Sequence, residues 1–113
     1  MNLFSSYMQK YFFPLFLAPM EEVSDLSFRM ICKDFGADFL ISEFVSSEAL
    51  IRDVEKSYRK LAFDEKERPF GIQIFGHNEY SLRKAAEKVA EKKPDFLTST
   101  LIFCVLCNIL FIS

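Results

Sequence analysis

The chain has 113 residues, of which half are hydrophobic and 27% are charged, and its net charge is −2. This length and balance indicate one small globular domain and argue against a wholly disordered chain. The charge predicts no basic face for a nucleic-acid backbone, and three cysteines are too few for a disulfide framework.

For residues 1–13 we expect an irregular or hairpin-like segment that precedes the first strand. The first ten residues contain no basic region followed by an apolar segment and a cleavage site. We therefore expect no signal peptide and a cytoplasmic location.

The next stretch predicts a strand, a loop and a helix. Residues 15–17 are an uninterrupted apolar run, typical of a strand covered on both faces, and Pro19 ends it because proline cannot donate a ladder hydrogen bond. Apolar positions at helical spacing predict a helix over residues 24–35, capped by one of its first two residues. Gly36 then favours a helix end.

Strands and helices alternate from here to about residue 96, which indicates an α/β fold of parallel βαβ units. The expected strands are residues 37–44, residues 70–76 and one that starts at 94–96. One expected helix is capped by Ser46 or Ser47 and continues, after a break, through residues 52–60. A second is expected at residues 79–92, capped by Asn78, and a turn is expected at residues 64–69.

Ligands of α/β proteins bind at the carboxyl ends of parallel strands. The loop Ala18, Pro19 and Met20 follows the first expected strand and is therefore a candidate site. Gln73 is a polar side chain within an apolar strand, where a buried amide needs a hydrogen-bond partner.

Several short motifs occur in a specific order along residues 15–96. Together they resemble the start of the tRNA-dihydrouridine synthases, most closely the bacterial type. The motifs are Leu17-Ala18-Pro19-Met20, Val23-Ser24-Asp25, Phe28-Arg29, Gly36-Ala37-Asp38, Ser42-Glu43, Val45-Ser46-Ser47-Glu48-Ala49-Leu50 and Gln73-Ile74-Phe75-Gly76.

This resemblance implies the N-terminal half of an FMN-binding TIM-type (β/α)8 barrel, with about four parallel strands and crossover helices. It implies reduction of uridine to dihydrouridine in tRNA, with NADPH recharging the flavin. By the resemblance Ala18, Pro19 and Met20 line the flavin, Gln73 hydrogen-bonds the isoalloxazine edge, and Ser42 and Glu43 support the site.

The chain departs from the family pattern in two places. Glu21 and Glu22 stand where the family usually has a small pair such as Ala-Gly. After Phe96 the family continues to a Gly-Cys-Pro motif, whose cysteine protonates uracil C5, and this motif is absent here. We therefore assign no catalytic residue and expect a truncated, inactive fragment, with residues 1–96 as a partial barrel domain that self-associates.

Residues 97–113 form an almost wholly apolar tail. One interpretation is out-of-frame translation after a frameshift just beyond Phe96. The alternative is a non-enzymatic protein anchored to a membrane by this tail, although about 16 apolar residues fall short of the roughly 20 that span a bilayer. Another flavin-binding barrel is a third possibility.

Two further groups of residues have simpler explanations. Cys104 and Cys107 have the spacing of half a zinc site, but no second pair exists, so we expect no metal site. Lys56, Arg59 and Lys60 form a modest basic cluster, which we interpret as a solvated helix face and not as a tRNA contact.

Overall fold

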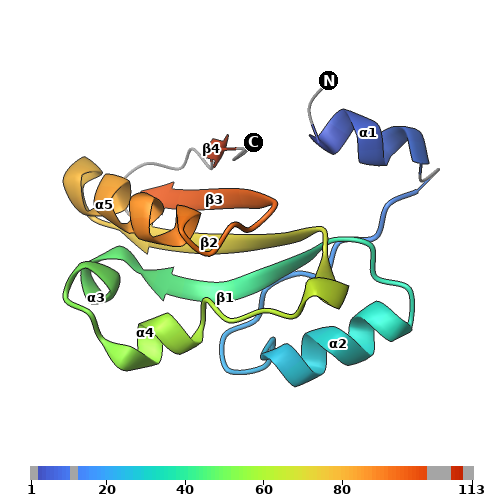
Figure 1. Ribbon diagram of the computed structural model, residues 1–113, viewed down its shortest axis with the longest axis horizontal. Helices are drawn as coiled ribbons and strands as arrows, with labels where there is room; N and C mark the ends of the chain where they lie inside the picture. The colour runs from blue at the N-terminus through green and yellow to red at the C-terminus, as the bar shows by residue number, and fades with distance from the viewer. Residues whose placement is uncertain (1–2, 11–12, 102–107, 111–113) are drawn as a thin grey trace.

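The computed structural model describes residues 3–10, 13–101 and 108–110. Short helices lie around a sheet with the order β1-β2-β3-β4 (Figure 1). The elements are α1 (Leu3–Lys10), α2 (Leu26–Asp34), β1 (Leu40–Ser46), α3 (Ser47–Ile51), α4 (Glu55–Arg59), the 3-10 turn η1 (Glu65–Glu67), β2 (Phe70–Gly76), α5 (Glu79–Ala90), β3 (Phe96–Leu101) and β4 (Asn108–Leu110).

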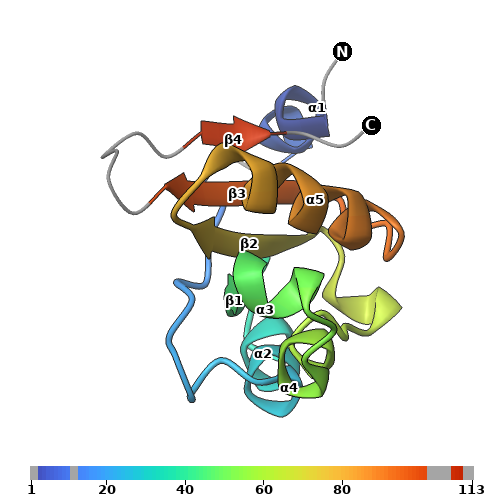
Figure 2. The same ribbon diagram turned by 90° about the vertical axis from the view of Figure 1, so that its left-hand side faces the viewer.

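Three of the four strands are parallel. β1 pairs with β2 and β2 with β3 in parallel, whereas β4 pairs with β3 in the antiparallel direction. Figure 2 shows the four strands stacked in this order. The α/β class is confirmed, and of the four or so parallel strands that the sequence predicts, the described residues form three.

The expected first strand, residues 15–17, is reduced to a single parallel bridge between Phe16 and Phe39. The Leu17 N–H donates to the Phe39 carbonyl oxygen, and the Phe39 N–H donates to the Leu15 carbonyl oxygen. The segment thus lies along the free edge of β1 without forming a ladder. The prediction of an irregular or hairpin-like segment ahead of the first strand is also wrong, because residues 3–10 form a helix.

Side-chain caps fix the helix starts where the sequence predicts them. Asp25 accepts a hydrogen bond from the Phe28 N–H at the start of α2. Ser46 caps α3 and Asn78 caps α5 in the same way. These caps satisfy backbone donors that the first helical turn leaves free.

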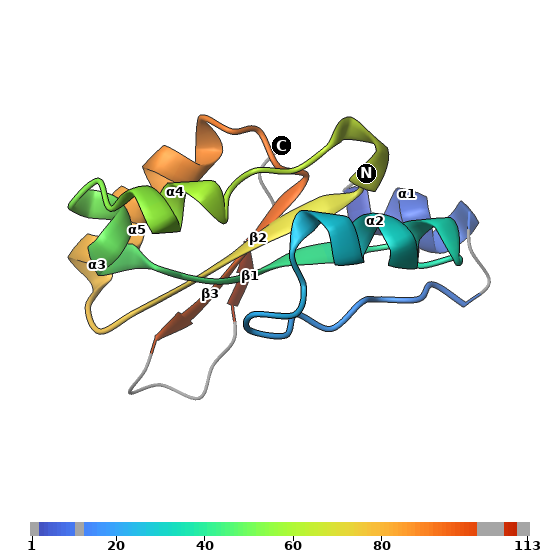
Figure 3. The ribbon, with the colours of Figure 1, turned by 90° about the horizontal axis from the view of Figure 1, so that it is seen from below.

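One face of the sheet holds the hydrophobic core. α3 packs against β1 and β2, and α5 packs against β2 and β3; Figure 3 shows α3, α4 and α5 together on this side of the strands. The buried side chains of this core are Leu40, Val45, Leu50, Leu61, Phe70, Ile72, Ile74, Ala85, Val89 and Leu97.

Alternation along β2 therefore turns Gly71, Gln73 and Phe75 to the opposite face. The register places Gly71 beside Phe96. A Cβ atom at Gly71 would lie 2.1 Å from the Phe96 ring, so glycine allows this ring to cross β2.

β1 carries one extra residue relative to β2. Ile41 pairs with Gly71 and Phe44 pairs with Gln73, so Ser42 and Glu43 together stand opposite Ile72. This bulge turns Phe44 toward the same face as Gln73.

The expected tail begins inside β3, which pairs with β2 along its whole length. Residues 102–107 and 111–113 lie outside the described part of the chain, so the frameshift and membrane interpretations of the tail stay predictions. Among the helices that the structure describes, none has the length and apolar character needed to cross a bilayer.

Candidate functional site

A hollow of about 570 Å³ opens at the carboxyl ends of the three parallel strands. The arrows of β1, β2 and β3 all point to this end of the molecule (Figure 1). The position is the one at which parallel α/β sheets bind ligands. The hollow is lined by Glu21, Phe44, Ser46, Lys56, Ser57, Lys60, Phe75 and Thr100.

Two aromatic side chains form an apolar wall of this hollow. The rings of Phe44 and Phe75 meet edge to face, with centroids 6.0 Å apart. Phe44 remains 37% exposed although it is a large apolar side chain. An exposed aromatic side chain in a hollow is suited to contact a planar ligand.

Gln73 lies two residues before Phe75, on the same face of β2. Its Oε1 atom is buried and accepts no hydrogen bond within the described part of the chain. Leaving a buried amide oxygen without a donor costs about 1–3 kcal/mol. A ligand with an N–H group aimed at this atom would remove that cost, so the residue fits a flavin ring edge.

The loop of Ala18, Pro19 and Met20 is closed by local hydrogen bonds. The Met20 N–H donates to Ser24 Oγ over 2.7 Å, and the Ser24 N–H donates back to the Met20 carbonyl oxygen over 2.9 Å. Ala18 and Met20 are exposed and Pro19 is half-buried. None of the three lines the hollow, but the adjacent Glu21 does.

Lys60 attaches this loop to β1. Its Nζ atom forms an ion pair with Glu21 and donates a hydrogen bond of 3.2 Å to the Phe44 carbonyl oxygen. The adjacent carboxylates of Glu21 and Glu22 would add negative charge beside a bound ligand. The ion pair with Lys60 offsets the charge of Glu21.

The backbone of Glu22 adopts a conformation that side chains rarely take. Its φ of 60° lies in the left-handed region, which glycine adopts without strain.

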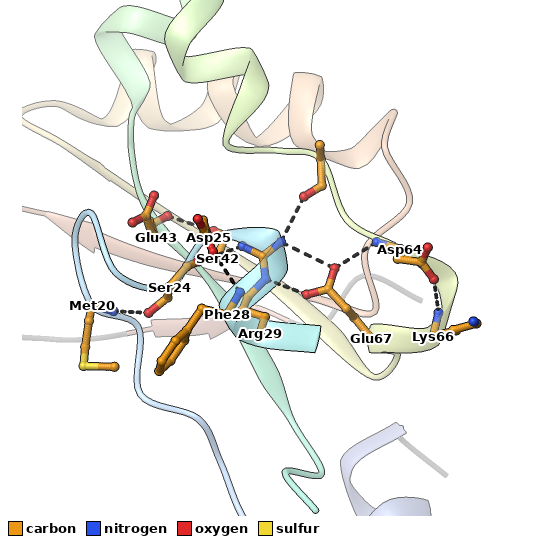
Figure 4. A network of polar contacts seen from close by, with 11 residues as sticks. Met20, Ser24, Asp25, Phe28, Arg29, Ser42, Glu43, Asp64, Lys66 and Glu67 are labelled. Carbon is orange, nitrogen blue, oxygen red and sulfur yellow. Dashed lines mark hydrogen bonds and ion pairs between the residues drawn. The ribbon is translucent and has the colours of Figure 1, made fainter. Parts of the chain in front are cut away.

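Figure 4 shows a buried network behind the loop. Arg29 Nη1 donates to the Ser24 carbonyl oxygen over 2.9 Å, and Arg29 Nε donates to Glu67 Oε1 over 2.5 Å. The Glu67 Oε2 atom in turn accepts from the Asp64 N–H. The network therefore joins the Met20–Ser24 turn to η1, which immediately precedes β2.

Ser42 and Glu43 occupy the bulge of β1. Ser42 Oγ accepts a hydrogen bond of 3.0 Å from the Gln73 N–H and donates to the Glu43 carbonyl oxygen. Ser42 thus fixes the backbone of β2 at Gln73. Glu43 instead lines a second hollow of about 250 Å³, and its buried Oε1 has no partner among the described residues.

The sequence alone gave no site role to Phe44 or Phe75, and it placed Lys60 in a basic cluster that was interpreted as a solvated helix face. Alternation from Gln73 could have identified Phe75, because both side chains point to one face of the strand. Lys60 gives no such signal, since its partner Glu21 lies 39 positions away.

Groups of three or more metal-binding side chains are absent from the described residues.

Comparison with known proteins supports one family. The family model "Dihydrouridine synthase" matches residues 16–96. A probable tRNA-dihydrouridine synthase of Aquifex aeolicus is 40% identical over 83 residues, which cover 72% of this chain and 26% of that relative. The tRNA-dihydrouridine synthase B of Pseudomonas aeruginosa is 36% identical over 77 residues, covering 68% and 23%.

A more distant relative is the tRNA-dihydrouridine(47) synthase [NAD(P)(+)] of Cryptococcus neoformans, 32% identical over 75 residues that cover 66% of this chain and 10% of the relative. The chain spans about a quarter of the length of the two bacterial relatives. The family model covers the first loop, the bulge and the whole of β2. The chain therefore belongs to the dihydrouridine synthase family.

Proposed function

We propose that this chain provides flavin-contacting residues of a tRNA-dihydrouridine synthase, which reduces uridine in tRNA to dihydrouridine with FMN and NADPH. The names of the relatives support the reaction, and one of them includes NAD(P). We further propose that the three parallel strands are the start of a TIM-type barrel, with residues 1–96 as the barrel part.

The buried Oε1 atom of Gln73 is the observation that carries this proposal. It lies on the strand face that leads to the hollow, and it lacks a donor among the described residues. An N–H group at the isoalloxazine edge would supply that donor. When bound, FMN would supply the hydride that reduces the uracil ring.

The chain's own residues would hold and shape this site. Ser42 fixes the backbone at Gln73, and hydrogen bonds between Met20 and Ser24 close the turn that follows Ala18 and Pro19. We propose that this loop borders the flavin. Glu43 would support the site from the bulge.

No residue of this chain is proposed as the proton donor to uracil. The Gly-Cys-Pro motif that carries it in the family does not occur in the sequence. We therefore expect the purified chain to bind FMN but to form no dihydrouridine in unmodified tRNA. Dihydrouridine formed by the chain alone, with FMN and NADPH present, would overturn this part of the proposal.

Substitution of Gln73→Leu tests the flavin contact. Loss of one hydrogen bond should weaken FMN binding about five- to tenfold. The same change removes an unsatisfied buried amide, so the flavin-free protein should become no less stable to urea. A structural role for Gln73 predicts the opposite, namely lower stability.

Gln9→Leu is the matched control, because Gln9 is exposed on α1. It should leave the FMN affinity unchanged in a titration followed by flavin fluorescence. Equal FMN affinity of the unsubstituted chain and the Gln73→Leu variant, or no FMN binding at all, would contradict the proposal.

A further inference from the structure

The three cations near α4 have different surroundings. Lys56 and Arg59 are exposed, as the interpretation of this cluster as a solvated helix face predicts. Arg59 pairs with Glu55, one turn earlier on the same helix. Lys60, which directly follows α4, differs from both, because only 19% of its side chain is exposed. The cluster therefore contains one cation that the fold largely buries.

Lys60 contacts two segments that are far apart in the sequence. Its Nζ atom pairs with Glu21 in the loop of residues 18–24 and donates a hydrogen bond of 3.2 Å to the Phe44 carbonyl oxygen in β1. Glu21, Phe44 and Lys60 all line the hollow of about 570 Å³. One ammonium group thus connects this loop to the strand that carries an aromatic wall of the hollow.

The loop of residues 18–24 has little packing of its own. Met20 is 40% exposed and Val23 is 46% exposed. The hydrogen bonds between Met20 and Ser24 close the turn but join the loop only to itself. Arg29 holds the far end of the loop through the Ser24 carbonyl oxygen. The ion pair between Glu21 and Lys60 holds the part of the loop that lines the hollow.

We propose that Lys60 is a positioning residue for the flavin, because it holds the loop of residues 18–24 against β1 so that both border the ring in one fixed geometry. This rests on the proposed function, which assigns a flavin to this end of the sheet. A loop that is ordered before the ligand arrives lowers the entropic cost of binding.

The exposure of the ion pair separates positioning from stability. The Glu21 side chain is 49% exposed, and ion pairs that are open to solvent contribute little to stability. Loss of the Lys60 ammonium should therefore change the geometry of the site more than the free energy of unfolding.

The test is an FMN titration of the full chain. Lys60→Met keeps an apolar stem but removes the charge and the N–H donors, so it should weaken FMN binding about fivefold. Lys60→Arg keeps both and should restore most of the affinity. At saturating FMN, the visible circular dichroism of the flavin should be weaker for Lys60→Met, because the ring is held in a less defined orientation.

Arg59→Met is the matched control. It removes the neighbouring ion pair of α4, whose two residues do not line the larger hollow. It should leave both the FMN affinity and the circular dichroism unchanged. Glu21→Gln combined with Lys60→Met should weaken FMN binding no more than Lys60→Met alone, since both changes remove the same ion pair.

A second measurement needs no flavin. The N–H groups of Met20, Val23 and Ser24 donate hydrogen bonds within the loop, so their hydrogen exchange reports how well the loop is ordered. Lys60→Met should speed this exchange about fivefold, as expected for a less ordered loop. Arg59→Met should leave the exchange unchanged.

Equal exchange rates for Lys60→Met and Arg59→Met would overturn the proposal, whether or not the chain binds FMN. Unchanged FMN affinity of Lys60→Met would also overturn it. A urea midpoint of Lys60→Met well below that of Arg59→Met would assign Lys60 a structural role instead. Failure of the proposed function has a different signature: FMN binding is absent or independent of Gln73, while exchange in the loop still depends on Lys60.

Discussion

The side chains of Arg29 and Glu67 form a buried ion pair, with 2.5 Å between Nε and Oε1, although they lie 38 positions apart in the sequence. Arg29 is 3% exposed and Glu67 is fully buried. The guanidinium also lies 4.8 Å from the centre of the Phe70 ring, at the start of β2. One pair thus connects α2, which follows the first loop, to the strand that carries Gln73.

Removal of one partner of this pair should be costly. Glu67→Gln leaves the Arg29 charge buried without its counter-ion, so we expect a loss of about 3–5 kcal/mol in the free energy of unfolding. Urea unfolding measures it, and Glu65→Gln, an exposed carboxylate in the same turn, is the control. The double variant Arg29→Met with Glu67→Leu should recover part of the loss, since it buries no charge. A loss below about 1 kcal/mol for Glu67→Gln would show that the pair does not hold these elements together.

Glu22→Gly should stabilise the fold by up to about 1 kcal/mol, because it relieves the left-handed backbone at φ 60°. Glu22→Ala should give no such gain, since alanine keeps the Cβ atom that causes the strain. Thermal unfolding of the two variants separates backbone relief from loss of the carboxylate. Equal melting temperatures for the two would contradict the backbone explanation.

Asp53 should make stability depend on acid pH. Hydrogen bonds from Lys88 and then from Tyr58 hold the pKa of the Asp53 carboxyl below its ordinary value of 3.8. As the pH falls, the unfolded chain therefore takes up this proton before the folded chain does. The stability contributed by the carboxylate is fully present above 3.8 and is lost as the pH falls below that value.

Asp53→Asn tests this dependence, because asparagine tolerates the φ of 57° at this position but does not titrate. The urea midpoint of the variant should fall less than that of the unsubstituted chain between about pH 6 and about pH 3. Asp34→Asn, at an exposed carboxylate, serves as the control. An unchanged pH profile for Asp53→Asn would rule out the contribution.

We expect the purified chain to self-associate through the free edge of β1. Residues 15–17 lie along that edge but make only a single bridge there, between Phe16 and Phe39, so most of the edge lacks a pairing strand among the described residues. Leu15 in this segment is 60% exposed. Open edges and exposed apolar side chains favour pairing between copies. Leu15→Lys should therefore lower the mass measured by sedimentation at high concentration. Tyr80→Lys, also at a side chain that is 60% exposed but on α5, should not. A monomer at all concentrations would contradict the prediction.

Local chemistry made several elements predictable from sequence. The strand at residues 70–76 has the predicted bounds, because its apolar run is covered by α3 and α5. Asp25 and Asn78 cap the predicted helices through bonds to residues three positions away. Gln73 was identified as a buried polar group in need of a partner, and its Oε1 is such a group.

Features that depend on distant residues were not predictable in this way. The apolar run at residues 15–17 suggested a strand buried on both faces, but Leu15 and Phe16 are exposed, so apolar character did not report burial. The antiparallel strand β4 lies within the apolar tail of residues 97–113, for which the sequence predicted no antiparallel strand. The attachment of Glu21 to Lys60 joins two loops through the fold and leaves no periodic pattern in the chain.

The extra residue in β1 determines where this strand can lose one residue and keep its pairing with β2. Loss of Glu43 would convert the irregular pairing between Ile41 and Phe44 into a regular one and leave the later side chains on their present faces. Loss of Val45 instead would move the side chain of Ser46 from the face that lines the hollow to the face that packs in the core. Related sequences should therefore accept a one-residue deletion at positions 42–43 more readily than at any other point of the strand.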